Sequence, residues 1–420
     1  MLALLAAIPR IVWCAFVRPD PTDGRFDDTG WYRGAAHYLA RGEGYLNPFS
    51  GTPTAGWPPG YPATLGATFK LFGEGIWQTQ ALNIAAAVLT VLVVYAIGCL
   101  MFDRRTAFIA AAALAVWPGQ VYFSSLGLSE PLFTLLFTAG IWLMLLAPVT
   151  SGGWRAIVLL TFGFVLGLAT LTRGQALLLL PVGVAFWCIA GIRWRPAIAW
   201  GILSALVVIV VLAPWVARNE RQLGSPVIIA TNVGANVWLG HHEGSTGRMQ
   251  TSAEVPLPDR AGLTQPEYEV EGNDLLHRKG LRFMVTHPAD EGRLSAIKVR
   301  AMYESDATAL DWNAAYEDGF YATDSLEWAL RRFANVWWFT AIALSGIGLL
   351  AARARFAGPV GLLPLLVGVW TLTHLLFFGD SRFHYPIVFV FALLGARGAV
   401  AMYEVLRRPQ PGIDSRYAPA

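Results

Sequence analysis

Residues 77–99 read WQTQALNIAAAVLTVLVVYAIGC, a run of 23 residues without a charged side chain. About 20 apolar residues in a helix cross the ~30 Å hydrocarbon core of a bilayer. This stretch therefore predicts a transmembrane helix, and the pattern recurs along the chain. We expect about ten spans, at residues 2–17, 77–99, 107–124, 130–147, 154–171, 174–191, 197–216, 335–352, 358–378 and 384–403.

The composition agrees with a membrane protein. Of 420 residues, 55% are hydrophobic and 14% are charged, whereas soluble domains carry about 25% charged residues. The 31 basic and 28 acidic residues are concentrated in two outer segments, 18–76 and 217–334. We therefore predict an all-α polytopic fold with interfacial helices on its outer face. One transmembrane domain, 1–408, contains both segments, and 409–420 is expected to be a disordered cytoplasmic tail.

The short connectors between spans predict the orientation. Short cytoplasmic loops carry an excess of Lys and Arg. If both termini are cytoplasmic, the inner connectors contain one acid, Asp103, and nine arginines: Arg104, Arg105, Arg155, Arg193, Arg195, Arg353, Arg355, Arg407 and Arg408. We therefore expect a multi-pass protein of the cell (inner) membrane, with its polar cavity on the outer face.

The outer segments predict short helices. In the first, Trp31–Ala40 is amphipathic with Asp28 placed to cap it, and the prolines of 57–62 exclude a helix there. In the second, 267–286 and 291–304 predict an interfacial helix pair broken at His287-Pro288, after a glycine-rich loop at 232–247.

Asp27 and Asp28 are the first candidates for chemistry. A carboxylate at a membrane surface can act as a general base, with its pKa set by partial burial. The alternative is helix capping, since Asp is a preferred N-cap. We predict Asp27 as the general base, with Asp28 beside it in the catalytic site.

Four more ionisable residues lie at the outer ends of spans. Arg173, Arg218 and Arg382 can clamp a phosphate with paired N–H donors, or can reach toward lipid headgroups instead. Glu130 follows Ser129 at a helix start and can simply cap it, pair with an arginine or bind a metal. We expect these arginines to bind the donor phosphate.

Sugar or acceptor contacts are predicted at Glu130, Tyr61, His241, His242 and His384. The adjacent histidines 241 and 242 lack a third ligand at a zinc-like spacing, so solvent exposure or substrate contact is favoured over a metal site. The sequence does not decide whether a divalent cation is a cofactor; if one binds, Asp28 or Glu130 is the expected ligand. The chain contains no phosphate-binding loop for a soluble nucleotide, and we expect membrane lipids but no nucleic acid as partners.

Together these motifs resemble the GT-C superfamily of integral-membrane glycosyltransferases. The resemblance is to glycosyltransferase family 39 and its bacterial relatives: protein O-mannosyltransferases, the lipid A aminoarabinose transferase and RgtA/B/C/D-like lipopolysaccharide enzymes. It rests on Phe26-Asp27-Asp28, Tyr38-Leu39-Ala40, Gly42-Glu43-Gly44-Tyr45, Pro58–Pro62, Leu128-Ser129-Glu130, Leu171-Thr172-Arg173, Pro214-Trp215 with Arg218-Asn219, and Arg382–Pro386.

The resemblance implies an inverting transfer of a sugar from a polyprenyl-phosphate donor. The acceptor hydroxyl would belong to a glycan, a lipid or a protein, and Asp27 would deprotonate it. Arg218 and Arg382 would stabilise the leaving phosphate. The family's Asp-Glu pair stands here as Asp27-Asp28, which weakens the case for a metal at Asp28.

Two other classes of membrane protein also fit these sequence features. A flippase or transporter would also need many spans, although transporters place charges near the midplane in two symmetric halves. An envelope-polymer ligase would use a large late outer loop such as 217–334. It would leave the first-loop aspartates and the proline turn unexplained.

Overall fold

The computed structural model describes residues 1–19, 27–250, 255–316, 324–353 and 358–407. These residues form helices joined by turns, with two isolated bridge pairs, Leu46–Pro53 and Arg248–Gly379. The predicted tail at 409–420 lies outside the described residues.

A helix stands at each of the ten predicted span positions. Six are long and apolar enough to cross a membrane, and a seventh is bent by 49° between Ala115 and Pro118. Three shorter apolar helices fill the remaining positions. The helices are α1 (Leu2–Phe16), α4 (Ile76–Met101), α5 (Arg104–Ala115) with α6 (Pro118–Tyr122) and η1 (Phe123–Ser125), α7 (Glu130–Leu146) with η2 (Ala147–Val149), α8 (Gly152–Thr172), η3 (Gly174–Leu178) with α9 (Leu179–Ile189), α10 (Trp194–Leu223), α15 (Asp324–Ala352), η5 (Pro359–Gly361) with α16 (Leu362–His374), and η6 (Ser381–Ile387) with α17 (Val388–Leu406).

Small residues let the long helices approach closely. A Cβ on Gly348 of α15 would lie 1.9 Å from the carbonyl oxygen of Leu394, and one on Gly398 of α17 would lie 2.1 Å from that of Leu344. Such contacts are typical of helix pairs in membranes, where lipid tails are as apolar as Leu and close packing drives association.

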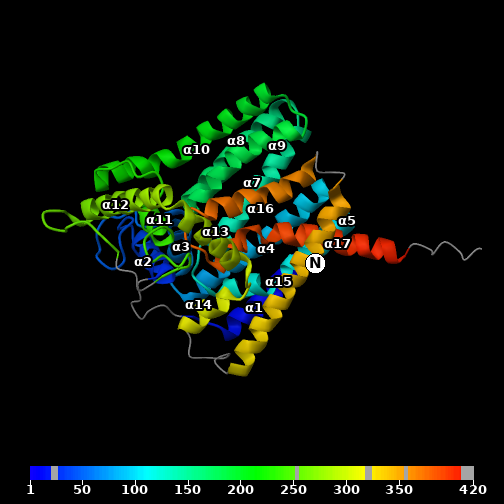
Figure 1. The fold of residues 1–420 in the computed structure, drawn as a ribbon, viewed down its shortest axis with the longest axis horizontal. Coiled ribbons are helices and arrows are strands. Elements are labelled where there is room, and N and C mark those ends of the chain that lie inside the picture. Colours follow the sequence, from blue (N-terminus) through cyan, green and yellow to red (C-terminus); the bar gives the residue numbers. More distant parts are fainter. Residues whose placement is uncertain (20–26, 251–254, 317–323, 354–357, 408–420) are drawn as a thin grey trace, which may run out of the picture.

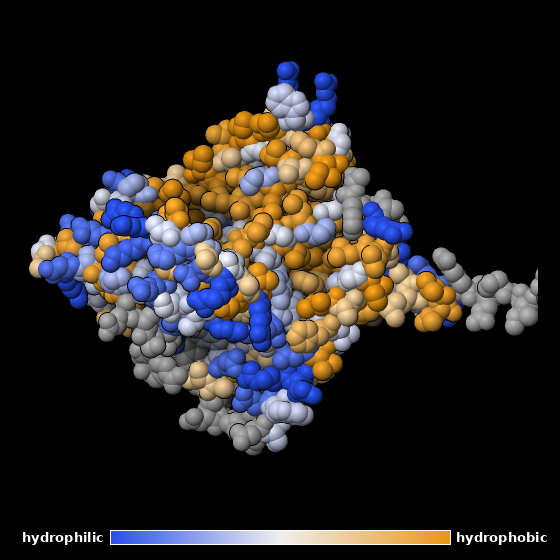
Figure 2. Space-filling model, in the orientation of Figure 1, coloured by the Kyte–Doolittle hydropathy of each residue, from blue (hydrophilic) through white to orange (hydrophobic). Residues whose placement is uncertain are grey.

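The remaining helices gather at one end of the long ones, on the left and lower side of Figure 1. They are α2 (Asp28–Ala40), α3 (Gly60–Phe72), α11 (Val233–Gly240), α12 (Gln265–Thr286), α13 (Pro288–Tyr303) and α14 (Thr308–Tyr316). Figure 2 shows polar side chains over this end and apolar ones over the long helices. The predicted helix pair around His287-Pro288 is confirmed as α12 and α13.

Three local expectations were wrong. Asp27, not Asp28, is the N-cap of α2, and its side chain accepts a hydrogen bond from Gly30 N. Helix α3 begins at Gly60, inside the proline motif, because a proline in the first helical turn removes no needed N–H donor. The glycine-rich stretch at 232–247 contains the eight-residue helix α11.

Candidate active site

The N-terminus of α2 presents both aspartates of the first outer segment. Asp27 is half-buried, and its Oδ1 caps the helix at 2.9 Å from Gly30 N. Asp28, the next residue, accepts one hydrogen bond from Trp57 Nε1 at 2.9 Å and another from Arg382 Nη1 at 2.7 Å. Asp28 is therefore held by an ion pair with Arg382 and by the indole of Trp57.

Arg382 reaches Asp28 from the turn before α17. Asp380 caps that turn by accepting a hydrogen bond from Arg382 N at 2.9 Å. The guanidinium also lies 5.3 Å from the ring centre of Trp312 in α14, and 12% of the Arg382 side chain is exposed. The cap and the aromatic contact hold the guanidinium in place beside Asp28.

Glu130 and Arg173 form a second ion pair beside the first. Arg173 Nη2 donates to Glu130 Oε1, and Arg173 Nε donates to Ser129 Oγ at 3.0 Å. Glu130 is fully buried, and its Oε1 also lies 3.9 Å from Arg382 Nε. The four charged groups thus form one cluster, built from α2, α7, the break after α8 and η6.

The cluster contains two carboxylates and two guanidinium groups, so its formal charges cancel. Burial alone would raise the pKa of Asp28, but the nearby Arg382 charge and the Trp57 hydrogen bond outweigh it and hold this pKa below 3.8. Glu130 Oε2 and Arg382 Nε are buried without a hydrogen-bond partner. The cluster therefore keeps unused hydrogen-bonding capacity.

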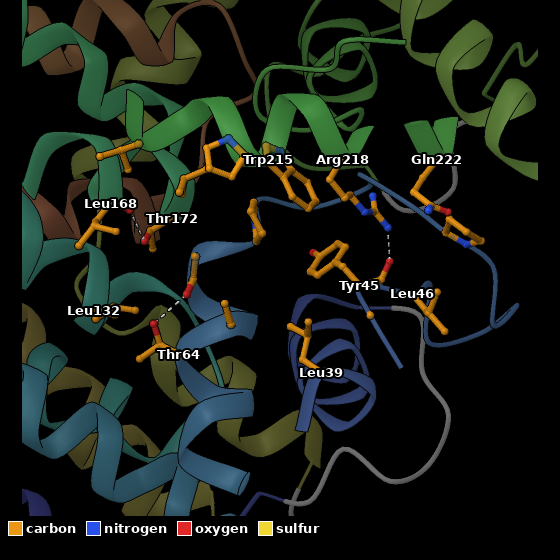
Figure 3. A pocket seen from close by; sticks show the side chains of 18 of the residues that line it. Leu39, Tyr45, Leu46, Thr64, Leu132, Leu168, Thr172, Trp215, Arg218 and Gln222 are labelled. Atoms are coloured by element: carbon orange, nitrogen blue, oxygen red, sulfur yellow. Dashed lines mark hydrogen bonds between the residues drawn. The ribbon is translucent and has the colours of Figure 1, made fainter. Parts of the chain in front are cut away.

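An apolar groove of about 800 Å³ lies between α3, α7, α8 and α10. Leu39, Leu132, Leu168, Trp215 and Gln222 are among the side chains around it (Figure 3). Most of its lining is apolar, and three of the helices that line it, α7, α8 and α10, are long and apolar enough to cross a membrane. This groove has the character of a site for a hydrocarbon chain.

Arg218 brings a positive charge to this groove. Its Nη1 donates to Thr54 O at 2.6 Å and to Asn219 Oδ1 at 2.9 Å, and its Nη2 donates to Tyr45 O at 2.6 Å. Figure 3 shows the guanidinium beside the side chains of Trp215 and Tyr45. A cation at an apolar groove is suited to a ligand with a lipid tail and an anionic head.

The proline turn and the end of α8 connect the groove with the charged cluster. Pro59 and Gly60 line the groove, while Trp57 in the same turn donates to Asp28. Thr172 also lines the groove and directly precedes Arg173. The structure thus gathers Asp28, Glu130, Arg173 and Arg382 in the cluster, with Arg218 at the adjoining groove.

The other predicted contact residues are bonded to groups outside the four-residue cluster. Tyr61 is buried and donates to Asn83 Oδ1 at 3.2 Å. His384 is buried between Asp306 Oδ1, at 3.0 Å, and Met302 O, at 2.7 Å.

The histidine pair after α11 is split between interior and surface. His241 is buried, with Nδ1 2.8 Å from Glu291 Oε1 and Nε2 3.0 Å from Lys298 Nζ. His242 is half-buried and stacks on Trp238. None of the predicted histidines lines the groove.

The carboxylates of the cluster do not fit a divalent cation. Both oxygens of Asp28 and one of Glu130 already accept hydrogen bonds from Trp57 or the arginines, and positive guanidinium groups surround them. Among the residues that the structure describes, no three His, Cys, Asp or Glu side chains form a metal-binding group. A magnesium or calcium ion takes six or more oxygen ligands.

Sequence reasoning missed Trp57 as the partner of Asp28, and it missed Glu269. Glu269 of α12 accepts hydrogen bonds from Thr54, Ala55 and Thr231. Its position in a mixed-charge helix gave no sign of this, because the contacts with Thr54 and Ala55 join residues more than 200 positions apart. Trp57, by contrast, is the first residue of the proline motif at 57–62, which the sequence analysis had singled out.

Comparison with known proteins identifies the fold. Residues 57–217 match the family model described as dolichyl-phosphate-mannose-protein mannosyltransferase. An undecaprenyl phosphate-α-4-amino-4-deoxy-L-arabinose arabinosyl transferase of Pseudomonas paraeruginosa is 31% identical over 161 residues, which are 36% of this chain and 28% of the relative. The chain therefore matches less than a third of this curated relative's length.

The whole chain resembles solved structures of an archaeal oligosaccharyltransferase from Archaeoglobus fulgidus. One, in complex with an inhibitory peptide and a dolichol-phosphate, aligns with a TM-score of 0.54 at 18% identity over 96% of this chain and 50% of that one. The apo form aligns with a TM-score of 0.56 at 15% identity, over 97% of this chain and 50% of that one. The chain therefore shares the fold of these solved structures, and the all-α fold with several membrane-spanning helices that its sequence predicted is confirmed.

Proposed function

We propose that this protein is an inverting glycosyltransferase that uses a polyprenyl-phosphate-linked sugar as its donor. The observation that carries the proposal is the apolar groove with Arg218 beside it, adjoining a buried cluster of carboxylates and arginines. The curated relative is named for transfer from undecaprenyl phosphate, and the family model for a dolichyl-phosphate sugar. Both names fit a lipid-phosphate donor.

The groove suits the prenyl chain of such a donor. Its lining is largely Leu, Pro, Val and Trp, and each buried CH₂ group contributes about 0.8 kcal/mol of favourable transfer free energy. Arg218 would contact the phosphate, because its fork of N–H donors matches phosphate oxygens. The sugar would then extend from the groove toward the cluster at Asp28.

Asp27 is the proposed general base. Asp28 is a weak base, since its pKa is held below 3.8 and both its oxygens accept hydrogen bonds. Asp27 precedes it at the start of α2, is half-buried, and accepts the capping hydrogen bond of Gly30 N with its Oδ1. In this assignment Asp28 orients Arg382, and Asp27 faces the acceptor.

The reaction is a single displacement. Asp27 takes the proton of the acceptor hydroxyl while the oxygen forms a bond to the anomeric carbon. The bond between that carbon and the phosphate oxygen breaks, and its electron pair leaves with the polyprenyl phosphate. Arg218 and Arg382 would stabilise the negative charge that develops on the phosphate, the kind of contact that contributes several kcal/mol in enzymes.

We place this reaction on the outer face of the cell membrane, with both termini in the cytoplasm. The support is the arginine-rich set of short connectors, since short cytoplasmic loops carry an excess of Lys and Arg. The acceptor hydroxyl belongs to a glycan, lipid or protein of the envelope.

Profiling of lipid-linked sugars tests the proposal. Cells that lack the gene receive the wild-type chain, Asp27→Asn or Asp103→Asn at matched membrane levels. Asn caps a helix about as well as Asp, so Asp27→Asn removes the base and keeps α2 capped. Asp103 caps α5 in the same way and is the matched control.

The proposal predicts that Asp27→Asn cells accumulate one polyprenyl-phosphate sugar and lose one glycosidic linkage, while Asp103→Asn cells match wild type. Equal profiles in all three strains, with a changed profile in the deletion strain, would refute Asp27 as the base. They would favour a transport or ligase function instead.

A further inference from the structure

Glu269 of α12 binds the loop that supports both parts of the site. Its Oε1 accepts from Ala55 N at 2.8 Å and from Thr231 Oγ1 at 2.6 Å, and its Oε2 accepts from Thr54 Oγ1 at 2.6 Å. One carboxylate therefore receives three hydrogen bonds from two distant segments of the chain.

The loop that Glu269 binds contacts Arg218 directly. Thr54, whose hydroxyl donates to Glu269, accepts a hydrogen bond from Arg218 Nη1 through its carbonyl oxygen, at 2.6 Å. Thr231 N donates to Ala55 O at 2.9 Å and closes the loop from its other side. The carbonyl that orients Arg218 is thus fixed by the carboxylate on α12.

The same loop leads to the charged cluster. Gly56 N donates to Thr54 Oγ1 at 2.9 Å, and the next residue is Trp57, whose indole donates to Asp28. Tyr45, whose carbonyl also accepts from Arg218, donates its hydroxyl to Trp57 O at 2.8 Å. Residues 54–57 therefore connect Arg218 with Asp28 through a series of hydrogen bonds.

Helix α12 is itself held firmly. A Cβ on Gly234 of α11 would lie 2.0 Å from Asn273 O, and one on Gly280 would lie 2.8 Å from Val237 Cγ1. Asn273 Oδ1 accepts from Gly234 N at 2.8 Å. Close packing of this kind leaves α12 little freedom to shift. The carboxylate of Glu269 is therefore held in one position, and it holds the loop at residues 54–56 in turn.

We propose that Glu269 is a positioning residue that sets the orientation of Arg218 toward the phosphate of the lipid donor. The inference rests on the proposed function, because it assigns the phosphate to Arg218. Glu269 acts through the carbonyl of Thr54 and does not touch the donor. Loss of the Glu269 carboxylate would let residues 54–56 move. The carbonyl oxygen of Thr54, one of the acceptors of the Arg218 guanidinium, would then no longer be fixed.

The central variant is Glu269→Gln, which keeps the size of the side chain but places an amide NH₂ against groups that donate. Glu271→Gln is the matched control, because Glu271 is exposed on the same helix. Purified proteins are titrated with undecaprenyl phosphate and, separately, with undecaprenol, which lacks the phosphate. Binding is read by native mass spectrometry, and hydrogen exchange follows the amides of Ala55 and Gly56.

We expect Glu269→Gln to weaken binding of undecaprenyl phosphate about tenfold, the size of one lost hydrogen bond to a charged group. Binding of undecaprenol should not change, and exchange at Ala55 and Gly56 should accelerate. In an Arg218→Gln background, Glu269→Gln should have no further effect on phosphate-lipid affinity. Glu271→Gln should match wild type.

Other outcomes overturn the inference. Equal weakening for both lipids would mean that the groove itself has collapsed, and unchanged affinity for undecaprenyl phosphate would mean that Arg218 does not depend on Glu269. A wild-type protein that binds the two lipids equally well would contradict the proposed function, and the positioning role would fail with it.

Discussion

Asp28 and Arg382 are 354 positions apart in the chain, yet they form an ion pair of 2.7 Å with side chains 18% and 12% exposed. Removing one partner of a buried pair leaves the other charge without compensation, whereas removing both can be nearly neutral. The pair therefore allows a test of the cluster that is independent of activity.

Arg382→Met should destabilise the protein by about 3 kcal/mol, the lower end of the range for a broken buried pair. The double variant Asp28→Asn/Arg382→Met should be more stable than Arg382→Met alone, because no charge is left unpaired. Thermal unfolding in detergent, arranged as a double-mutant cycle, measures the coupling. Additive effects would contradict the contact between these side chains.

Lys298 gives a second prediction at this scale. Burial lowers the pKa of Lys298 from 10.5 to about 8, although the nearby Glu291 raises it. The unfolded chain therefore binds more protons than the folded one between pH 8 and 10.5, so stability rises with pH across this window.

We expect the melting temperature of wild type, relative to Lys298→Met, to increase between pH 8 and 10. The difference between the two proteins isolates Lys298 from other groups that titrate there. A difference that stays constant or falls with rising pH would show that the amine is not held in its neutral form.

Among the elements, the contact between α3 and α8 shapes the groove. A Cβ on Gly60 would lie 2.5 Å from Thr172 Oγ1 and 2.8 Å from the carbonyl of Leu171. Both Gly60 and Thr172 line the groove. The width of the groove at this end therefore depends on the missing side chain of Gly60.

Gly60→Ala should destabilise the protein by about 1–3 kcal/mol, the usual cost of overpacking, and should weaken binding of undecaprenyl phosphate. Gly153→Ala is the control, because a Cβ there meets nothing within 4 Å. Melting temperature and lipid binding are measured together. A Gly60→Ala protein as stable as Gly153→Ala would contradict the close approach of α3 to α8.

The sequence predicted the spans better than it predicted the outer helices. Span positions follow from apolar length, which is a local property of the chain. Helix α15 begins at Asp324, whereas the span was predicted to begin at residue 335. The prediction left out the first turns because they carry Arg331 and Arg332 and resemble a surface helix. Helix α11 was missed because glycines disfavour helix, and its packing on α12 overrides that preference.

The candidate site could be predicted only in part. The sequence showed the residue types of Asp28, Glu130, Arg173 and Arg382 and their positions near span ends, where charges are costly. Their pairing was not, because it depends on how α2, α7, α8 and η6 pack. The same limit explains why Glu269 was missed and why buried His241 and His384 were expected at the site.

For the molecule as a whole, the orientation in the membrane is the prediction to test. Cys14, Cys99 and Cys188 are replaced, and a single cysteine is introduced at Ala261 or at Gly153, both exposed. In intact cells a membrane-impermeant maleimide should label Ala261→Cys, while Gly153→Cys should react only after permeabilisation. Labelling of Gly153→Cys but not of Ala261→Cys in intact cells would place the site on the cytoplasmic face of the membrane. That result would exclude an acceptor in the envelope.

The proposed function requires the groove beside Arg218 to hold a polyprenyl phosphate. A cryo-electron microscopy structure of the protein with undecaprenyl phosphate tests it most directly. We predict the phosphate against the Arg218 guanidinium, with the prenyl chain along Leu132, Leu168 and Trp215. Lipid density at another site, with this groove empty and Arg218 still bound only to Thr54, Asn219 and Tyr45, would contradict the account.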